Sequence, residues 1–301
     1  MRTDKPNLST PRKNGMTRRS VVLPLLAILA AMACFQMGAA AAKQLYPAIG
    51  PIGAASVRLL FGAAILLALV RPWRHWPANP PLLGLFGLGI CMAATLLFFY
   101  LAIDHLPLAV AITIQIMGPL LLAIVTSTRA ADLLWVALAA GGLLCLLGAA
   151  PSDMPVNTIG LIYALIAAAG WAGYIVFGRM AGNAFGHGTA ALSVAVAALA
   201  ILPVGLAKVG AAMFAPALLP WALLVALLSA AIPFSLELFA MPRLPARTFA
   251  VLMSLEPAFA VLSGFAFLGE HLRLVQILGI LLVIAASAGT VWSHSRAGQP
   301  A

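Results

Sequence analysis

The chain has 301 residues, of which 63% are hydrophobic and only 8% are charged. Because soluble domains carry about 25% charged residues, this chain cannot cover itself with a polar surface, and its composition indicates a polytopic α-helical membrane protein. The formal net charge of +10 does not indicate nucleic-acid binding, since the basic residues lie between apolar runs and gather on no single face.

Residues 1–19 are polar and basic and include Pro6 and Pro11, which predicts a disordered tail. Basic residues ahead of an apolar run are also typical of a signal peptide. The run from Val21 to Ala42, however, is longer than the about 7–15 residues of such a segment. We therefore expect a retained first helix, with Met16 as an alternative start of the chain.

Runs of about 18–24 apolar residues then recur with short breaks. Each run is close to the about 20 residues that a helix needs to cross a bilayer. Turn signals mark the breaks, among them Tyr46-Pro47, Leu106-Pro107 and Leu244-Pro245. The sequence therefore predicts ten transmembrane helices, at 20–42, 52–70, 82–104, 108–127, 132–150, 157–179, 188–207, 217–241, 246–268 and 273–293.

Lys and Arg are divided unequally between alternate breaks, and an excess of them marks the cytoplasmic side of a membrane. With the N-terminus in the cytoplasm, the inner side holds thirteen of the seventeen basic residues. The outer side holds three, Lys43, Lys208 and Arg273, and Arg58 lies within a span. We therefore expect both termini to face the cytoplasm, with residues 294–301 as a cytoplasmic tail.

An internal repeat relates residues 20–150 to residues 157–293. An offset of 138 residues takes Leu106-Pro107 to Leu244-Pro245 without a gap. Each half holds five spans, and this odd number inserts the second half upside down. The predicted fold class is therefore an all-α membrane protein whose ten transmembrane helices form two inverted five-helix repeats, a recurring design of secondary transporters. The same offset relates Pro119 to Pro257 and Asp132 to Glu270.

Pro119 and Pro257 fall about mid-span in the fourth and ninth predicted helices. Each removes a backbone donor and frees a carbonyl, which a membrane helix tolerates where it faces protein or a wet cavity. We expect helix hinges at both positions, with plain structural kinks as the alternative. Asp132 and Glu270 open the fifth and tenth helices, where a carboxylate is favourable against the helix dipole, so we interpret them as caps.

Several stretches carry a resemblance to a known family: residues 234–237, 243–249, 252–258 and 267–270, with 58–59, 71–74 and 118–120 in the first half. Through them the chain resembles the EamA-type branch of the drug/metabolite transporter superfamily, over essentially its whole length after residue 20. The resemblance implies two five-helix EamA-type repeats and export of small amino acids, of the threonine and homoserine kind, across the bacterial inner membrane. It also implies proton antiport and alternating access. A carrier of this superfamily for another small metabolite is the alternative.

Three ionisable residues lie inside the predicted spans, where each costs about 2.5–3.5 kcal/mol on insertion scales. Arg58 comes about six residues into the second span, roughly 9 Å below its outer edge. Its guanidinium could bind a substrate carboxylate through two hydrogen bonds. The alternatives are a structural ion pair with Glu237 or Glu256, or snorkelling to the outer interface.

Glu256 lies near the midplane in the ninth span. A carboxylate whose neighbours change between inward-facing and outward-facing states can take up and release a proton. It could equally bind a substrate ammonium group or form a static buried pair. Glu237 lies about four residues before the inner end of the eighth span, so a salt bridge or gate with Arg243 or Arg247 is favoured there over substrate contact.

Four further side chains are candidates for the same cavity. Gln115 and Gln36 are amides within spans, which could line a cavity or only bridge helices. Trp171 and Tyr174 lie about one turn apart in the sixth span, where packing in the helix bundle is the favoured alternative to cavity lining.

The sequence offers no set of residues for an enzyme or a metal site. The five histidines fall at breaks or ends, and the three cysteines have neither metal-ligand nor disulfide spacing. A membrane-embedded enzyme would need a cluster of nucleophile, base or metal ligands at one depth. We expect no cofactor and no metal; the expected partners are a small-molecule substrate, protons and the lipid bilayer. Ala285 and Gly289 could pack within the chain or form a homodimer contact.

Overall fold

The computed structural model describes residues 18–42, 44–106, 108–127, 130–147, 157–256, 258–259, 262 and 273–297. All regular elements within these ranges are helical, which confirms the predicted all-α class. The main helices are α1 (Arg18–Ala42), α2 (Tyr46–Val70), α3 (Leu82–Ile103), α4 (Leu108–Val125), α5 (Ala130–Leu147), α6 (Thr158–Phe185), α7 (Gly188–Val209), α8 (Leu219–Ala226), α9 (Ile232–Ala240), α10 (Ala246–Met253) and α12 (Leu274–Ala297). Short helical turns are η1 (Pro72–His75), η2 (Gly210–Phe214), η3 (Pro216–Leu218), η4 (Leu227–Ala231) and η5 (Met241–Arg243).

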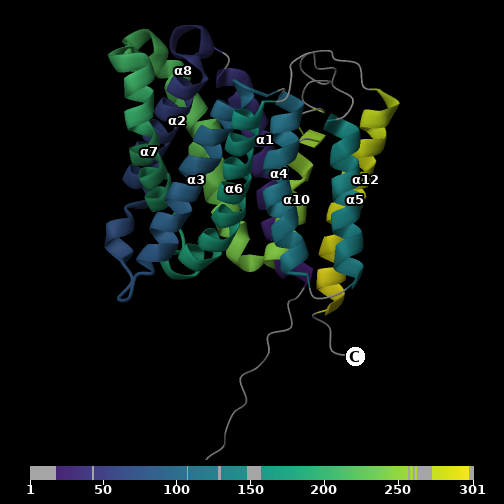
Figure 1. Ribbon diagram of the computed structural model, residues 1–301. Helices are drawn as coiled ribbons and strands as arrows, with labels where there is room; N and C mark the ends of the chain where they lie inside the picture. Colours follow the sequence, from purple (N-terminus) through teal and green to yellow (C-terminus); the bar gives the residue numbers. More distant parts are fainter. Residues whose placement is uncertain are drawn as a thin grey trace, which may run out of the picture.

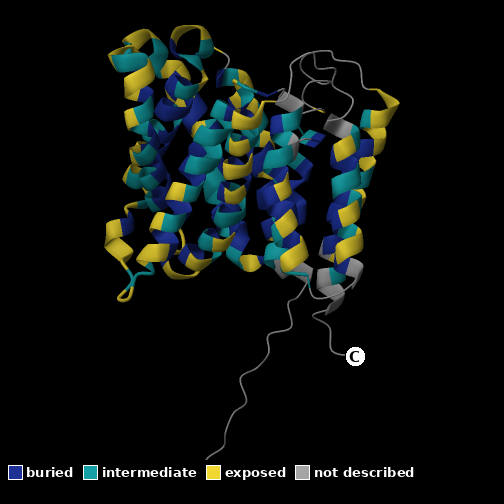
Figure 2. Ribbon diagram, in the orientation of Figure 1, coloured by how far each residue is buried: buried dark blue, intermediate teal, exposed yellow. Residues whose placement is uncertain are grey.

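The helices stand side by side in a bundle whose outer faces carry exposed apolar side chains and whose inward faces are buried (Figures 1 and 2). In the described part of the chain, six helical segments are long and apolar enough to cross a membrane, and three shorter apolar helices accompany them. Each of the ten predicted spans coincides with helix, although the ninth extends beyond α10 into residues outside the described ranges. The protein is a multi-pass membrane protein.

The second predicted span begins too late, because Tyr46-Pro47 starts α2 instead of breaking the chain. Pro47 fits the first turn of a helix, where its missing N–H is not needed. The actual irregularity is a kink at Gly50, whose φ of 62° suits glycine, followed by Pro51. This correction places Arg58 twelve residues into the helix, about 18 Å along its axis and not about 9 Å.

The sixth predicted span ends too early, since α6 continues past Arg179 to Phe185. The Arg179 guanidinium donates hydrogen bonds to the carbonyls of Met241, at 3.2 Å, and Leu244. Because these carbonyls, at the turn between α9 and α10, accept from the guanidinium, Arg179 can lie within α6 and the helix continues past it. At the two ends, α1 begins at Arg18 and α12 runs to Ala297, and the rest of both predicted tails lies outside the described residues.

The eighth predicted span is broken into α8, the π-helical turn η4 and α9. Pro233 cannot donate to the carbonyl four residues earlier and would clash with it, and a wider turn relieves both problems. Glycines on the neighbouring helices use this region for close contact: a Cβ at Gly38 or Gly62 would meet Ser229 or Ala230 at 2.6–2.7 Å. The irregular turn therefore lies against α1 and α2.

Helices from the two halves of the sequence pack on each other. α3 contacts α6 and α7, α2 contacts α7, α1 contacts α9, α4 contacts α6 and α10, and α5 pairs with α12. Gly289 of α12 packs on Trp135 of α5, whose indole donates to the Ser293 hydroxyl at 2.9 Å, so this small residue packs within the chain. Pro119 lies inside α4, and Pro257 is outside the described residues. Their role as hinges stays a prediction.

Gly118 tests how closely α4 and α6 must approach. A Cβ at this position would overlap the backbone carbonyl of Ala168. We expect Gly118→Ala to destabilise the protein by about 1–3 kcal/mol, because the helices can separate only by disturbing their other contacts. Gly141→Ala is the matched control, since a Cβ there meets no described atom within 4 Å. Thermal unfolding in detergent compares them, and equal unfolding temperatures would contradict the packing.

Candidate functional site

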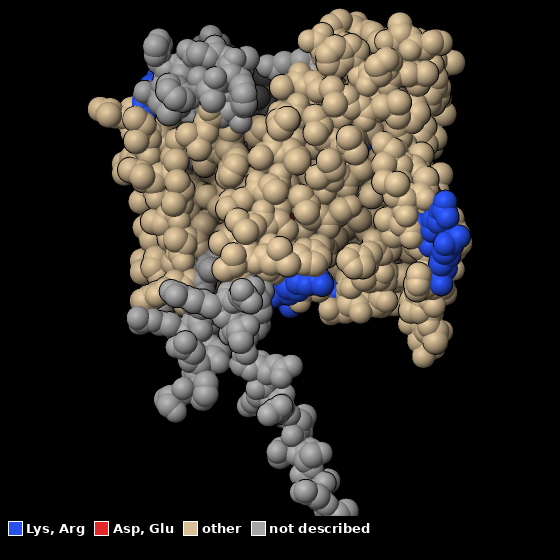
Figure 3. Space-filling view, turned by 180° about the vertical axis from the view of Figure 1, so that it is seen from behind, with Lys and Arg blue, Asp and Glu red and all other residues tan. Residues whose placement is uncertain are grey.

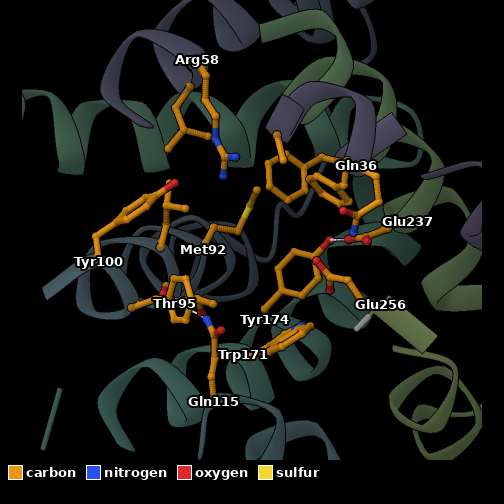
Figure 4. Close-up of a pocket in the computed structure, with 16 residues that line it drawn as sticks. Gln36, Arg58, Met92, Thr95, Tyr100, Gln115, Trp171, Tyr174, Glu237 and Glu256 are labelled. Atoms are coloured by element: carbon orange, nitrogen blue, oxygen red, sulfur yellow. Dashed lines mark hydrogen bonds between the residues drawn. The ribbon is translucent and has the colours of Figure 1, made fainter. Parts of the chain in front are cut away.

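A cavity of about 300 Å³ lies at the centre of the bundle, between α1, α2, α3, α4, α6, α9 and the segment that follows α10 (Figure 4). About ten water molecules occupy this volume in liquid water, so the cavity suits a small metabolite. All seven site residues expected from the sequence line it: Gln36, Arg58, Gln115, Trp171, Tyr174, Glu237 and Glu256. The structure thus brings together side chains from both halves of the chain.

Arg58 points from α2 into this cavity, from the top of the view in Figure 4. Its Nε is buried without a hydrogen-bond partner among the described residues. Within the same residues, Arg58 forms no ion pair with Glu237 or Glu256. This conformation therefore contains no direct structural ion pair between Arg58 and either glutamate. A buried N–H without an acceptor is costly, so an anionic group that enters the cavity and accepts from this Nε would be favoured there.

Glu237 projects inward from α9 and is only 4% exposed. The Tyr174 hydroxyl donates a hydrogen bond to its Oε2 at 2.7 Å (Figure 4). A hydrogen bond to a carboxylate is charge-assisted and holds the side chain in one orientation. Tyr174 therefore does more than fill space, because it fixes the carboxylate at the wall of the cavity.

The favoured sequence interpretation, an inner-face salt bridge of Glu237 with Arg243 or Arg247, is not formed in the described part of the chain. Arg243 lies 3.8 Å over the Phe239 ring and donates to the Phe239 carbonyl at 2.5 Å. Arg247 pairs with Asp132 at 3.4 Å. Both guanidiniums lie beyond the end of α9, where local partners satisfy them, whereas Glu237 is a turn deeper. Asp132 lies in the first turn of α5, as expected for a cap, and Glu270 is outside the described residues.

Glu256 enters the cavity from the segment after α10, beside Tyr174 and on the same side as Glu237 (Figure 4). Gln36 of α1 lies next to Glu237 in the same view. The two carboxylates thus occupy one side of the cavity, and the Arg58 guanidinium comes from another. The site thus holds a guanidinium and two carboxyl groups that face a common space without a direct ion pair between them.

Aromatic rings form the apolar part of the wall. Phe35 and Phe234 meet edge to face with centroids 5.5 Å apart, and the Tyr174 ring is 6.3 Å from Phe234. Such contacts contribute about 0.5–1.5 kcal/mol beyond the burial itself. Tyr174 therefore both packs in the bundle and lines the cavity, so the two sequence interpretations are compatible.

The sequence analysis missed the contribution of α3, which supplies Met92, Thr95 and Tyr100. The Thr95 hydroxyl donates to the Cys91 carbonyl at 2.8 Å, and Gln115 Nε2 donates to the Thr95 carbonyl at 3.4 Å. Gln115 thus both bridges two helices and reaches the cavity. Thr95 and Tyr100 were detectable as polar groups within an apolar span, but their spacing alone does not say which face of α3 is inside.

The described residues contain no group of three or more His, Cys, Asp or Glu side chains that could hold a metal ion. The polar groups that line the cavity include one guanidinium, two carboxylates, amides and hydroxyls. These groups can bind a small molecule that carries both a positive and a negative charge, such as a zwitterion.

Comparison with known proteins places this site in a family. Residues 158–292 match the model of the EamA-like transporter family. The threonine/homoserine exporter RhtA of Salmonella typhimurium strain LT2 is 42% identical over 286 residues, 95% of this chain and 97% of the relative. RhtA of Escherichia coli strain K12 is 41% identical over 276 residues, 92% of this chain and 94% of the relative.

A solved crystal structure of another protein shares the fold. It superposes with a TM-score of 0.69 over 90% of this chain and 97% of that chain, at 19% sequence identity. At this identity the similarity shows the arrangement of the helices and not their chemistry.

Water in the cavity can be tested with cysteines on two faces of α3. Thr95 lines the cavity, whereas Ile90 on the same helix is 52% exposed at the lipid-facing surface. After replacement of Cys34, Cys91 and Cys145 by alanine, we expect Thr95→Cys to react about tenfold faster than Ile90→Cys with a hydrophilic maleimide, since the reactive thiolate forms in water. Labelling rates in membranes give the answer, and equal rates would mean that the cavity is dry.

Proposed function

The chain belongs to the EamA-like transporter family, and from this premise we propose that it exports threonine and homoserine across the inner membrane by alternating access, in exchange for protons. Two exporters of these amino acids match it over nearly their whole length at 41–42% identity. A membrane-embedded enzyme is set aside, because these relatives are exporters and the family is one of transporters.

One observation carries the proposal: the cavity combines a guanidinium whose buried Nε has no hydrogen-bond partner among the described residues with a pair of carboxyl groups on another side. Every amino-acid substrate is a zwitterion at neutral pH. Arg58 binds the substrate carboxylate through its planar guanidinium, and Glu256 binds the ammonium group. Glu237 is held by Tyr174 and provides a second carboxyl group nearby. The size of the cavity, about 300 Å³, supports a ligand as small as an amino acid.

Glu256 is also the residue that we assign to proton coupling. A carboxylate in an apolar site binds a proton when no cation is near and releases it when a cation arrives. When substrate occupies the cavity its ammonium group compensates Glu256. When the substrate has left, a proton takes its place. One carboxylate can thus bind either the substrate or a proton and exchange one for the other.

Alternating access is the mechanism expected of an inverted repeat. The pattern of helix contacts supports such a repeat. α3 packs on α6 and α7, while the segment from α8 to α9 packs on α1 and α2. The repeat makes α1 the counterpart of α6, α2 of α7, α3 of the segment from α8 to α9, α4 of α10, and α5 of α12. Exchanging each helix for its counterpart turns the first of these sets of contacts into the second. The pairs α2 with α7, α4 with α10 and α5 with α12 map onto themselves. Residues 20–150 and 157–293 then form two halves that rock about the cavity, with Pro119 and Pro257 as hinges.

We place both termini in the cytoplasm, on the side where the basic residues gather. Viewed from behind, most of the visible Lys and Arg lie in the lower half of the molecule (Figure 3). The lower end includes η1, which follows α2 and carries Arg74 (Figure 1). An excess of basic residues near helix ends marks the cytoplasmic side.

The function is tested by efflux from cells preloaded with labelled threonine or homoserine. We expect cells that contain the protein to lose both amino acids faster than control cells, and a protonophore to abolish the difference. Arg58→Gln should slow export by roughly ten- to a hundredfold, because it removes a charge-assisted interaction of about 1.5–3 kcal/mol.

Arg74→Gln is the matched control, since Arg74 is exposed on η1 outside the cavity and its replacement should leave efflux unchanged. Efflux equal to the control cells would refute amino-acid export and favour a carrier for another metabolite. Efflux that survives the protonophore would leave the substrate assignment standing and remove the proton coupling.

The orientation is tested by reporters fused after Ala301. We expect a fused green fluorescent protein, which becomes fluorescent in the cytoplasm, to be bright, and a fused alkaline phosphatase, which folds only outside the cytoplasm, to be inactive. The opposite pair of results would reverse the assigned sides.

A further inference from the structure

Threonine and homoserine carry a third polar group beyond the two charges, the side-chain hydroxyl. The cavity has a third polar region as well. In Figure 4, Gln115 reaches in from α4 at the bottom of the view, away from Arg58 at the top and from the two carboxylates at the right. A neutral amide there matches a neutral hydroxyl, just as the charged groups match the zwitterion.

The local bonding leaves the Gln115 amide able to bind a ligand. Its Nε2 donates to the Thr95 carbonyl at 3.4 Å, a long hydrogen bond that orients the side chain without using its full capacity. An amide has two N–H donors and an acceptor oxygen, and one donor is engaged here. It can therefore both donate to a substrate hydroxyl and accept from it. The hydroxyls of threonine and homoserine lie one carbon apart along the side chain, and the amide can serve both positions.

Two hydroxyls of the cavity already interact with other protein groups. The Thr95 hydroxyl donates to the Cys91 carbonyl, and the Tyr100 hydroxyl interacts with that of Tyr46. Gln36 lies beside Glu237, on the side where the substrate ammonium group binds (Figure 4). Among the amides and hydroxyls of the cavity, Gln115 is thus the one best placed to contact a group on the far side of the substrate from both charges.

We propose that Gln115, oriented by the Thr95 carbonyl, recognises the side-chain hydroxyl of the exported amino acid and sets the preference of the cavity for hydroxylated substrates. This inference rests on the proposed function. A site built to hydrogen-bond a substrate hydroxyl rejects the analogue that lacks it, because its own polar group is then left without a partner.

The test uses 2-aminobutyrate, which is the deoxy analogue of both threonine and homoserine. Purified protein is reconstituted into liposomes, and the transport of the three labelled amino acids is compared. We expect the unaltered protein to prefer the two hydroxylated substrates. In Gln115→Met, which keeps the length of the side chain, and in Gln115→Leu, we expect the preference to fall by about five- to tenfold while 2-aminobutyrate transport persists.

Met117→Leu is the matched control, since Met117 lies two residues away on α4 and is 46% exposed on the outer surface. It should leave all three rates unchanged. Persisting 2-aminobutyrate transport also shows that a Gln115 variant is folded, so a structural defect is distinguished from a change of specificity.

Two outcomes overturn the inference: an unchanged preference in both Gln115 variants, or an equal loss of all three activities, which would assign Gln115 to helix packing alone. If the unaltered protein transports none of the three amino acids, the proposed function itself fails, and the two failures are therefore distinguishable.

Discussion

A charge inside a membrane must be compensated, and this bundle is organised around charges that do not compensate each other directly. Arg58, Glu237 and Glu256 face one cavity, and within the described residues they form no ion pair with one another. Removing an ion from water costs several kcal/mol even after the protein relaxes. Such an arrangement is expected only where something else completes it. A zwitterion brings one charge for each side, and a proton can replace its positive end.

Irregular backbone makes this arrangement possible. The kink at Gly50 follows the first turn of α2 and the π-helical turn η4 interrupts the eighth span, while glycines of α1 and α2 lie against η4. Departures from regular helix are tolerated in a membrane where the backbone faces protein, which is the situation of η4 against α1 and α2.

The basic residues near the ends of the helices behave differently from Arg58. Arg179 donates to the carbonyls at the turn between α9 and α10, Arg243 stacks on Phe239, and Arg247 pairs with Asp132. Each has a partner outside the cavity. These local contacts keep the guanidiniums away from Glu237, so the carboxylate remains in the cavity with Tyr174 as its donor. These basic residues thus have partners outside the cavity, whereas the polar groups of the cavity remain available to a ligand, as a binding site requires.

The sequence by itself determined the helical class, the approximate spans and the identity of the polar residues that matter, because hydropathy and the cost of buried charge act locally along the chain. Arg58, Gln115, Glu237 and Glu256 were recognisable as polar groups that a membrane span does not keep without reason. Only the tertiary structure decided which of them meet. The depth of Arg58 depended on where α2 begins, the partner of Glu237 on a tyrosine 63 positions away, and the inward face of α3 on its packing against α6 and α7. These are contacts between distant segments, and no local pattern encodes them.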